Sequence, residues 1–325
     1  MKTETLFFAI KQVKFLRSLA DIKILLDQFP FLMQRLIKSY VRDTTVPPTL
    51  QLEPTNYCNL KCISCSRDRM NRKMGYMEFS LFKKIIDDAS RIGIRRVHFY
   101  LHGEPLLHPE IVEMIKYIKS KGIGMNLVTN GMLFDRKKII DILSSNVNFG
   151  DYVTFSILGD SHEVHETVMR GIDHERVIHN VLDFVELRKK HGTNGPTIET
   201  IFYAMPENVH ELQQYVKRWK GIVDHVKKVP SISNSFAAYK KGLNDDIPLR
   251  QNTCMNIWER MTVYWNGDVT MCCEDIDGNY VVGNLAEKTI KEIWNSRELL
   301  SFRALHKEKR FGEIALCKRC DMFTP

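Results

Sequence analysis

The chain has 325 residues, of which 44% are hydrophobic and 26% charged, the composition of an ordinary soluble globular protein. No stretch approaches the ~20 consecutive apolar residues of a membrane-spanning helix. The formal net charge is +8, but no basic stripe with interleaved aromatic residues predicts nucleic-acid binding.

Residues 1–46 are expected to form an N-terminal helical extension, because apolar residues recur close to a 3.6-residue period from Phe7 to Leu26. Basic residues interrupt this apolar run and no small-residue cleavage site follows, so we expect no signal peptide and a cytoplasmic location. The extension is expected to pack against the main domain. Peripheral contact with a membrane surface is the alternative.

An alternation of strands and helices follows the prolines at 47 and 48. Strands are expected at 49–54, 96–103, 124–131, 152–159, 197–205 and 222–229, with helices near 79–93, 109–122, 135–145, 161–191 and up to about 220. This pattern predicts a parallel sheet in an α/β fold, a partial (β/α)6 TIM-type barrel over residues 47–235. Chemistry is then expected at the carboxyl ends of the strands.

The alternation stops near residue 235. Residues 236–325 are expected to form a small α+β domain that includes a hairpin over 261–272 with Asn266 and Gly267 at its turn.

Three of the eight cysteines lie directly after the first strand. Cys58, Cys62 and Cys65 are spaced C-x3-C-x2-C, and neither a fourth cysteine nor a histidine lies nearby. In a reducing compartment cysteines are more often metal ligands than disulfides. Three thiolates can hold a four-iron cluster and leave one iron open. A disulfide plus a spare thiol is the disfavoured alternative.

This spacing after a first strand resembles the signature of the radical S-adenosylmethionine (radical SAM) superfamily. The resemblance extends to later strand ends: Gly103, Glu104 and Pro105 are similar to the Gly-Gly-Glu element that meets the methionine amino group. Further positions that resemble cofactor-binding ones are Asn130, Ser156 and Arg170. The resemblance implies a [4Fe–4S] cluster on the three cysteines with S-adenosylmethionine (SAM) at its open iron. Ser64 departs from the family, which often has an aromatic residue there.

The C-terminal cysteines resemble a twitch or SPASM-type module. In such a module four cysteines ligate one auxiliary [4Fe–4S] cluster, and the matching set here is Cys254, Cys272, Cys317 and Cys320. A cluster with four protein ligands has no open iron and would carry electrons. A structural zinc site with the same four ligands is the alternative.

Cys273 remains outside this set. It is either a buried thiol without chemistry or a hydrogen-atom donor to a substrate radical, as in radical SAM epimerases. Cys272 and Cys273 could also exchange roles.

The resemblance implies reductive cleavage of SAM to a 5′-deoxyadenosyl radical that removes a hydrogen atom from a substrate C–H bond. Oxidation or epimerisation of a sugar-like or other small polar substrate would follow. Modification of a ribosomal peptide is the second reading, and a non-catalytic zinc or iron–sulfur protein is the third. A radical SAM enzyme also implies an electron donor such as flavodoxin or ferredoxin.

Overall fold

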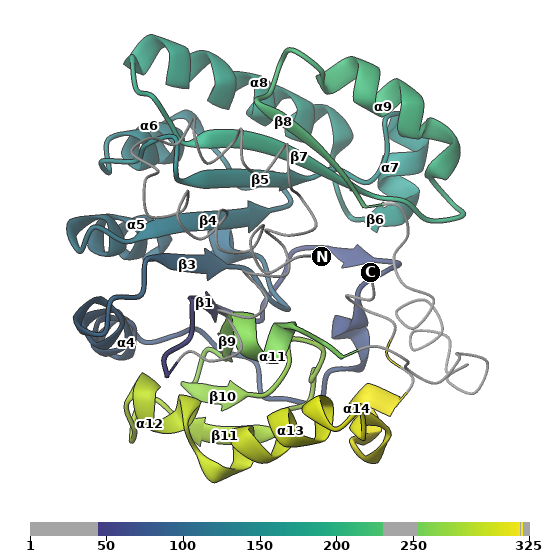
Figure 1. Cartoon of the computed structure of the whole chain (residues 1–325). Coiled ribbons are helices and arrows are strands. Elements are labelled where there is room, and N and C mark those ends of the chain that lie inside the picture. Colours follow the sequence, from purple (N-terminus) through teal and green to yellow (C-terminus); the bar gives the residue numbers. More distant parts are fainter. Residues whose placement is uncertain (1–44, 230–252, 319, 321–325) are drawn as a thin grey trace, which may run out of the picture. The chain divides into compact units, whose positions relative to one another are not determined.

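The structure is a computed structural model that describes residues 45–229, 253–318 and 320 (Figure 1). The expected helical extension at 1–44 and the expected domain boundary near 235 lie outside the described residues. Among the residues described, no helix combines the length and apolar character that crossing a bilayer requires.

Six parallel strands form the centre of the main sheet. In spatial order they are β1 (Thr49–Leu52), β3 (Arg96–Phe99), β4 (Gly124–Thr129), β5 (Tyr152–Ser156), β7 (Thr197–Tyr203) and β8 (His225–Val229). Every neighbouring pair is parallel, so the carboxyl ends share one edge, as the arrows of β3, β4 and β5 in Figure 1 show. Each strand lies within an expected range, which confirms the α/β fold with a parallel sheet.

Helices connect these strands and bury their apolar faces against the sheet. They are α4 (Phe79–Arg91), α5 (Ile111–Ser120), α6 (Arg136–Leu143), α7 (His162–Val168), α8 (His174–His191) and α9 (Leu212–Trp219), with 3-10 turns η1 (Ser66–Arg69), η2 (Pro105–Leu107) and η3 (Val209–Glu211). The ring of Phe82 in α4 lies 5.9 Å from that of Phe99 in β3. The ring of Phe184 in α8 lies 6.0 Å from that of Phe155 in β5.

The opposite face of the sheet is polar. Neighbouring residues of a strand point to opposite faces, so His98, Thr154 and Ser156 point away from the helices that cover Phe99 and Phe155. We call the face that carries these three residues the inner face. Gln51 and Thr262 also hydrogen bond to each other, at 3.2 Å, across neighbouring strands. This polar character suits a surface that meets a ligand rather than a dry core.

The sheet continues into the C-terminal part of the chain. Strand β9 (Arg260–Val263) pairs parallel with β1, and β10 (Asp268–Thr270) and β11 (Val281–Asn284) follow in antiparallel order. Gly267 has φ 89° at the turn between β9 and β10, where the sequence predicted a hairpin turn. The other C-terminal elements are α11 (Asn256–Glu259), α12 (Ile290–Trp294), α13 (Arg297–Lys307), η5 (Phe311–Glu313) and α14 (Ala315–Lys318).

The helix expected at 161–191 is divided, contrary to the prediction. Helix α7 ends at Val168, and the chain then forms the short strand β6 (Met169–Arg170), which pairs antiparallel with β2 (Lys61–Cys62). Gly171 has φ 90°, a conformation that a continuing helix does not allow. The Asp173 side chain then caps α8 by accepting a hydrogen bond from the Arg176 backbone N–H.

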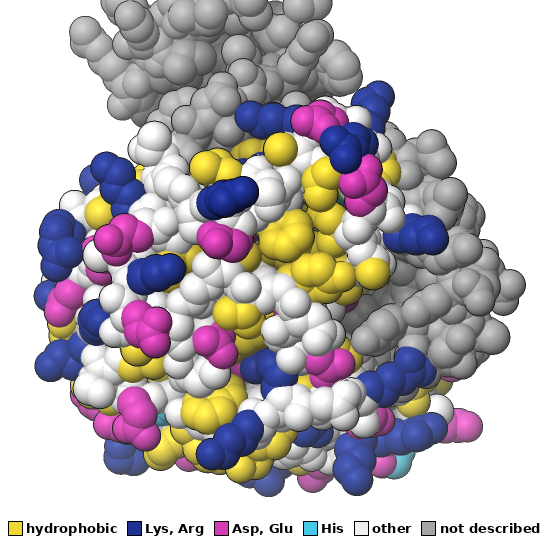
Figure 2. All heavy atoms as spheres, turned by 90° about the horizontal axis from the view of Figure 1, so that it is seen from below, with side chains coloured by type: hydrophobic (Ala, Val, Ile, Leu, Met, Phe, Trp, Pro, Cys, Tyr) yellow, Lys and Arg dark blue, Asp and Glu magenta, His cyan; other side chains and the backbone are white. Residues whose placement is uncertain are grey.

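Helices α12 and α13 contribute to the face shown in Figure 2. Basic and acidic side chains are interspersed there with apolar ones, and neither sign forms a continuous block in this view.

Candidate iron–sulfur and cofactor site

The three N-terminal cysteines share one loop at the carboxyl end of β1. Cys62 lies in β2, and Cys65 precedes η1, where its backbone N–H donates to Cys62 O at 3.1 Å. The Arg67 guanidinium donates to Leu60 O at 2.9 Å and to Cys58 O at 3.4 Å. Backbone atoms and the Arg67 side chain therefore hold the loop in shape. None of these hydrogen bonds uses a thiol, so they leave the three thiols available as ligands.

The thiols of this loop are half-buried. Burial, together with the nearby Glu104 and Cys65 charges, raises the pKa of Cys58 to about 11. The Cys65 contribution means that the two thiols lie within electrostatic reach of each other. A metal would have to displace their protons, since the thiolate is the ligand form.

Glycine at 103 is required by a close backbone contact. A Cβ atom there would lie 2.0 Å from Thr55 O and 2.8 Å from Tyr57 O. The following residue donates its backbone N–H to Tyr57 O at 2.8 Å. The segment after β3 therefore lies directly against the start of the cysteine loop.

Glu104 joins three of the strand ends. Its side chain is 2% exposed, and its Oε1 accepts hydrogen bonds from Thr129 Oγ1 at 2.7 Å and from Leu106 N at 3.0 Å. Its Oε2 accepts from the Asn130 backbone N–H at 2.8 Å. Burial raises the pKa of the Glu104 carboxyl, and these hydrogen bonds partly offset the rise. An ammonium group near it would favour the charged form.

Asn130 connects the β4 end to the cysteine loop. Its Nδ2 donates to Asn59 Oδ1 at 2.9 Å. Pro105 is buried as the first residue of η2, beside Glu104. Ser156, half-buried, ends β5 on the inner face. The exposed Arg170 pairs with Lys61 between β6 and β2, next to Cys62. Gly103, Glu104, Asn130 and Arg170 thus lie at the cysteine loop, and Ser156 lies at the same edge of the sheet.

The C-terminal cysteines come from three separate segments of the chain. Cys254 is buried before α11, Cys272 and Cys273 follow β10, and Cys317 lies in α14 with Cys320 just after it. Cys320 N donates to Cys317 O at 3.2 Å. The backbone N–H of Leu316 donates to the Tyr280 hydroxyl at 3.3 Å, which brings α14 against the segment that precedes β11.

Cys272 and Cys273 have different surroundings. Cys272 Sγ accepts from the Glu274 backbone N–H at 3.4 Å, and a hydrogen bond with Cys273, together with burial, raises the pKa of the Cys272 thiol. Cys273 Sγ accepts from Asn256 Nδ2 at 3.3 Å and donates to Glu274 Oε1 at 3.7 Å.

The donor sets fit iron–sulfur clusters by their chemistry. Each group supplies thiols, the preferred ligands of such clusters, and no disulfide joins cysteines of the described chain. Within the described ranges, no three histidine, cysteine or acidic side chains converge closely enough to hold one metal ion. A cluster has no such requirement, because each of its thiolates binds a different iron.

Several polar residues at the site were not predicted from the sequence. They are Glu53, Arg72, Tyr100, His102, Tyr203, Arg260 and Glu274. For Tyr100 and His102 the available signal was their alternation with His98 at the carboxyl end of an expected strand over 96–103, although the strand itself ends at Phe99. Burial, with Arg260, Arg96 and Lys227 nearby, lowers the pKa of His98 to about 3.

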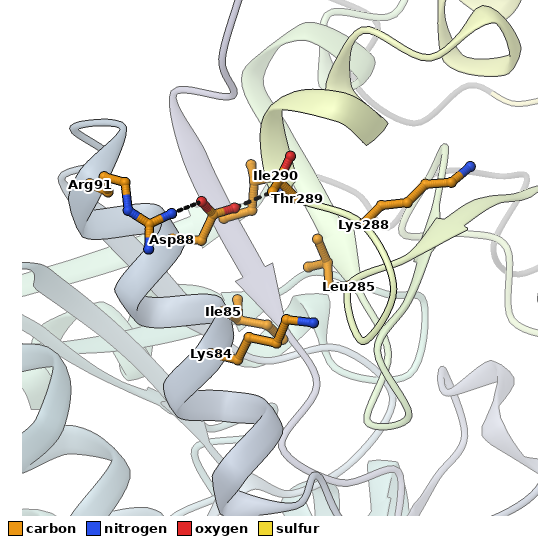
Figure 3. Close-up of a pocket in the computed structure, with 8 residues that line it drawn as sticks. All are labelled: Lys84, Ile85, Asp88, Arg91, Leu285, Lys288, Thr289 and Ile290. Carbon is orange, nitrogen blue, oxygen red and sulfur yellow. Dashed lines mark hydrogen bonds and ion pairs between the residues drawn. The ribbon is translucent and has the colours of Figure 1, made fainter.

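A surface pocket lies elsewhere, between α4 and the connection from β11 to α12 (Figure 3). Asp88 in this pocket accepts a hydrogen bond from Ile290 N at 2.8 Å and pairs with Arg91 at 3.0 Å. None of the predicted site residues lines this pocket. It lies where the C-terminal part of the chain packs on α4.

Two family models match the chain. The model described as the radical SAM superfamily matches residues 52–218, and the one described as an iron–sulfur cluster-binding domain, SPASM, matches residues 254–321.

Two curated relatives match most of the chain. The tungsten-containing aldehyde ferredoxin oxidoreductase cofactor-modifying protein of Pyrococcus furiosus is 23% identical over 316 residues, covering 84% of this chain and 87% of the relative. The S-adenosyl-L-methionine-dependent 2-deoxy-scyllo-inosamine dehydrogenase of Niallia circulans is 23% identical over 281 residues, covering 84% of this chain and 92% of the relative.

Two solved structures share the fold. BtrN in complex with AdoMet and 2-DOIA has a TM-score of 0.59 at 21% identity, covering 86% of this chain and 94% of that chain. Streptococcus suis SuiB bound to its precursor peptide SuiA has a TM-score of 0.59 at 17% identity, covering 90% of this chain and 76% of that chain.

Proposed function

The chain belongs to the radical SAM superfamily, and we propose that Cys58, Cys62 and Cys65 ligate its reactive [4Fe–4S] cluster. The family and its SPASM module imply SAM, this cluster and an auxiliary iron–sulfur cluster as cofactors. The shared loop at the carboxyl end of β1 and the proximity of Cys58 to Cys65 support the ligand assignment. When bound, the cluster and SAM supply a 5′-deoxyadenosyl radical that removes a hydrogen atom from a substrate C–H bond.

Glu104 is proposed to bind the SAM amino group. The carboxylate receives hydrogen bonds from Thr129, Leu106 and Asn130, and an ionised carboxylate has about four acceptor positions. One position therefore remains for an ammonium group, whose charge would offset the burial of the carboxylate. Gly103 and Pro105 shape the backbone there. Asn130, Ser156 and Arg170 are proposed to complete the SAM site from the neighbouring strand ends.

Cys254, Cys272, Cys317 and Cys320 are proposed to hold the auxiliary [4Fe–4S] cluster. The surroundings of Cys272 support its place in this set. Its sulfur accepts a backbone N–H, an interaction that stabilises a thiolate ligand. Cys273 Sγ also accepts, from the Asn256 side chain, but its thiol donates toward the Glu274 carboxylate, which favours the protonated form. Cys273 is then the thiol available for chemistry with the substrate.

The substrate is proposed to be a small sugar-like or other polar molecule that is oxidised or epimerised. The polar inner face supports this class, as does the match to an aminocyclitol dehydrogenase over 92% of that relative. Peptide modification is the second candidate, supported by the likeness to SuiB. The match covers 76% of the SuiB chain but 94% of the BtrN chain. A larger part of SuiB than of BtrN therefore lies outside the match. A one-electron donor such as flavodoxin or ferredoxin is proposed as the partner.

The test is metal content followed by product analysis. Anaerobic purification and reconstitution should give about eight irons per chain, and changing all three N-terminal cysteines to alanine should leave about four. The loaded enzyme is then incubated with SAM, dithionite and 2-deoxy-scyllo-inosamine, and the product is examined by mass spectrometry. A product lacking two hydrogens supports oxidation and an isomer supports epimerisation. Stoichiometric zinc without iron would contradict the proposal.

A further inference from the structure

A group of polar side chains from four elements meets beside the proposed SAM site. Tyr100 and His102 follow β3, Tyr203 ends β7, Arg260 begins β9, and Glu274 lies in the loop after β10. Arg260 Nη1 donates to the Tyr100 hydroxyl at 2.8 Å. Segments far apart in the sequence are therefore joined at this point of the sheet.

Tyr203 lies within electrostatic reach of both Tyr100 and Glu274. Burial, together with the charges of Tyr100, Glu274 and Cys273, raises the pKa of Tyr203 to about 12. Burial lowers the pKa of His102 to about 3, and a hydrogen bond to the Cys273 backbone partly opposes this shift. The loop after β10 thus lies against the end of β3, where the SAM-binding segment begins at Gly103.

Two members of the group, Glu274 and His102, have few hydrogen-bond partners within the described chain. Glu274 Oε1 receives only the long hydrogen bond from Cys273 Sγ, at 3.7 Å, among the interactions of the described residues. Nε2 of His102 is buried without a partner in the same part of the chain. Buried polar atoms are nearly always paired, and the carboxylate of the half-buried Glu274 has no strong donor in the described chain.

Glu53, a buried carboxylate that has a structural role, differs from Glu274 in the hydrogen-bond donors that it receives. Glu53 is 0% exposed and receives both terminal nitrogens of Arg72, at 2.8 and 3.1 Å. It also accepts from the Trp265 backbone N–H at 3.3 Å. Glu274 has no such set of donors among the described residues, which indicates that its donors come from a ligand.

We propose that Tyr100, Tyr203, Arg260 and Glu274 form the substrate subsite and that it takes an amino-bearing polyol. The inference rests on the proposed function and narrows its substrate class. Glu274 binds the ammonium group, because a charge-assisted hydrogen bond is the strongest that a carboxylate can accept. Arg260 and the two tyrosines bind hydroxyl groups, for which they supply both donors and acceptors. His102 directly precedes Gly103 of the proposed SAM site and forms a hydrogen bond with the Cys273 backbone.

The experiment uses the reconstituted full-length enzyme with SAM and dithionite. The rate of 5′-deoxyadenosine formation is measured against the concentration of two probes: 2-deoxy-scyllo-inosamine, which carries an amine, and scyllo-inositol, which carries hydroxyl groups alone. We expect the amine to raise the rate at lower concentration. Glu274→Gln should raise its half-maximal concentration about tenfold or more, because a charge-assisted hydrogen bond is lost. For scyllo-inositol, the same change should have less than about a threefold effect.

Two further variants keep the test decisive if Glu274→Gln loads its clusters poorly. Tyr203→Phe should raise the half-maximal concentrations of both probes by a similar factor, because it removes a contact with a substrate hydroxyl. Glu287→Gln is the matched control at an exposed glutamate outside the subsite and should respond like the unchanged enzyme.

The subsite proposal is overturned if Glu274→Gln responds to both probes as the control does, or if scyllo-inositol matches the amine. It is also overturned if neither probe changes the rate while the unchanged enzyme still cleaves SAM without them. Absence of any 5′-deoxyadenosine from the fully loaded enzyme would instead overturn the proposed function.

Discussion

Arg72 and Glu53 form a buried ion pair with two contact points, at 2.8 and 3.1 Å between nitrogen and oxygen. Their side chains are 10% and 0% exposed. Nε of Arg72 also donates to Ile276 O at 2.8 Å. One guanidinium therefore connects the end of β1, the segment after the cysteine loop and the loop that carries Cys272 and Cys273.

Removing this guanidinium should strongly destabilise the protein. Arg72→Met leaves the Glu53 carboxylate buried without its partner, a change that typically costs roughly 3–5 kcal/mol. The free energy of unfolding in urea measures the effect. Arg91→Met is the matched control, because Arg91 is 71% exposed in a surface pair with Asp88 and should cost less than about 1 kcal/mol. Equal costs for the two variants would contradict the structural role of Arg72.

The cost of Arg72→Met should also depend on pH. Burial raises the pKa of Glu53, and Arg72 partly offsets this rise, so the variant should have a still higher folded-state pKa. A raised pKa contributes stability that is fully present below the unfolded value and is lost as pH rises through the folded value. The destabilisation should therefore be larger near pH 7.5 than near pH 5. Urea titrations at both values check this, and a cost independent of pH would contradict it.

Gly103→Ala should disrupt the cofactor site. The added Cβ would lie 2.0 Å from Thr55 O, so the backbone of the cysteine loop would have to shift. We expect a loss of roughly 1–3 kcal/mol in stability and reduced iron on the N-terminal cysteines. Gly312→Ala is the control, since a Cβ at Gly312 meets no atom within 4 Å. Iron content and urea unfolding of both variants decide the matter, and normal iron loading of Gly103→Ala would refute the expectation.

Cys273→Ala separates the two proposed outcomes of the reaction. If its thiol returns a hydrogen atom to the substrate radical, the variant should still form 5′-deoxyadenosine but stall before the epimerised product. If the reaction is an oxidation, the oxidised product should persist. Iron content is measured alongside, because a loss of about four irons would instead identify Cys273 as the cluster ligand in place of Cys272.

The parallel sheet could be predicted from the sequence because its signals are local. Each of the six strands combines an apolar period with flanking turn residues, and the C-x3-C-x2-C spacing after the first strand identified the superfamily that the family match confirms. The later strand-end residues followed from the same resemblance. Their proposed roles in binding SAM stay predictions.

The missed features depend on contacts between distant segments. The pairing of β9 with β1 brings Arg260 to Tyr100 across 160 positions, and no local pattern reports such a contact. The two-residue strand β6 is too short to interrupt the helical period of its surroundings visibly. Arg72 lies in a basic stretch, and no local pattern indicates that its partner is Glu53, 19 positions earlier.

The central claim is that the N-terminal cysteines hold the cluster that cleaves SAM and the C-terminal cysteines hold a cluster that does not. The most direct test is the yield of 5′-deoxyadenosine from anaerobically reconstituted Cys58→Ala and Cys317→Ala with SAM and dithionite. We predict that Cys58→Ala yields none, whereas Cys317→Ala still yields it but gives little substrate-derived product. Retained cleavage in Cys58→Ala, or its loss in Cys317→Ala with the N-terminal iron intact, would contradict the account.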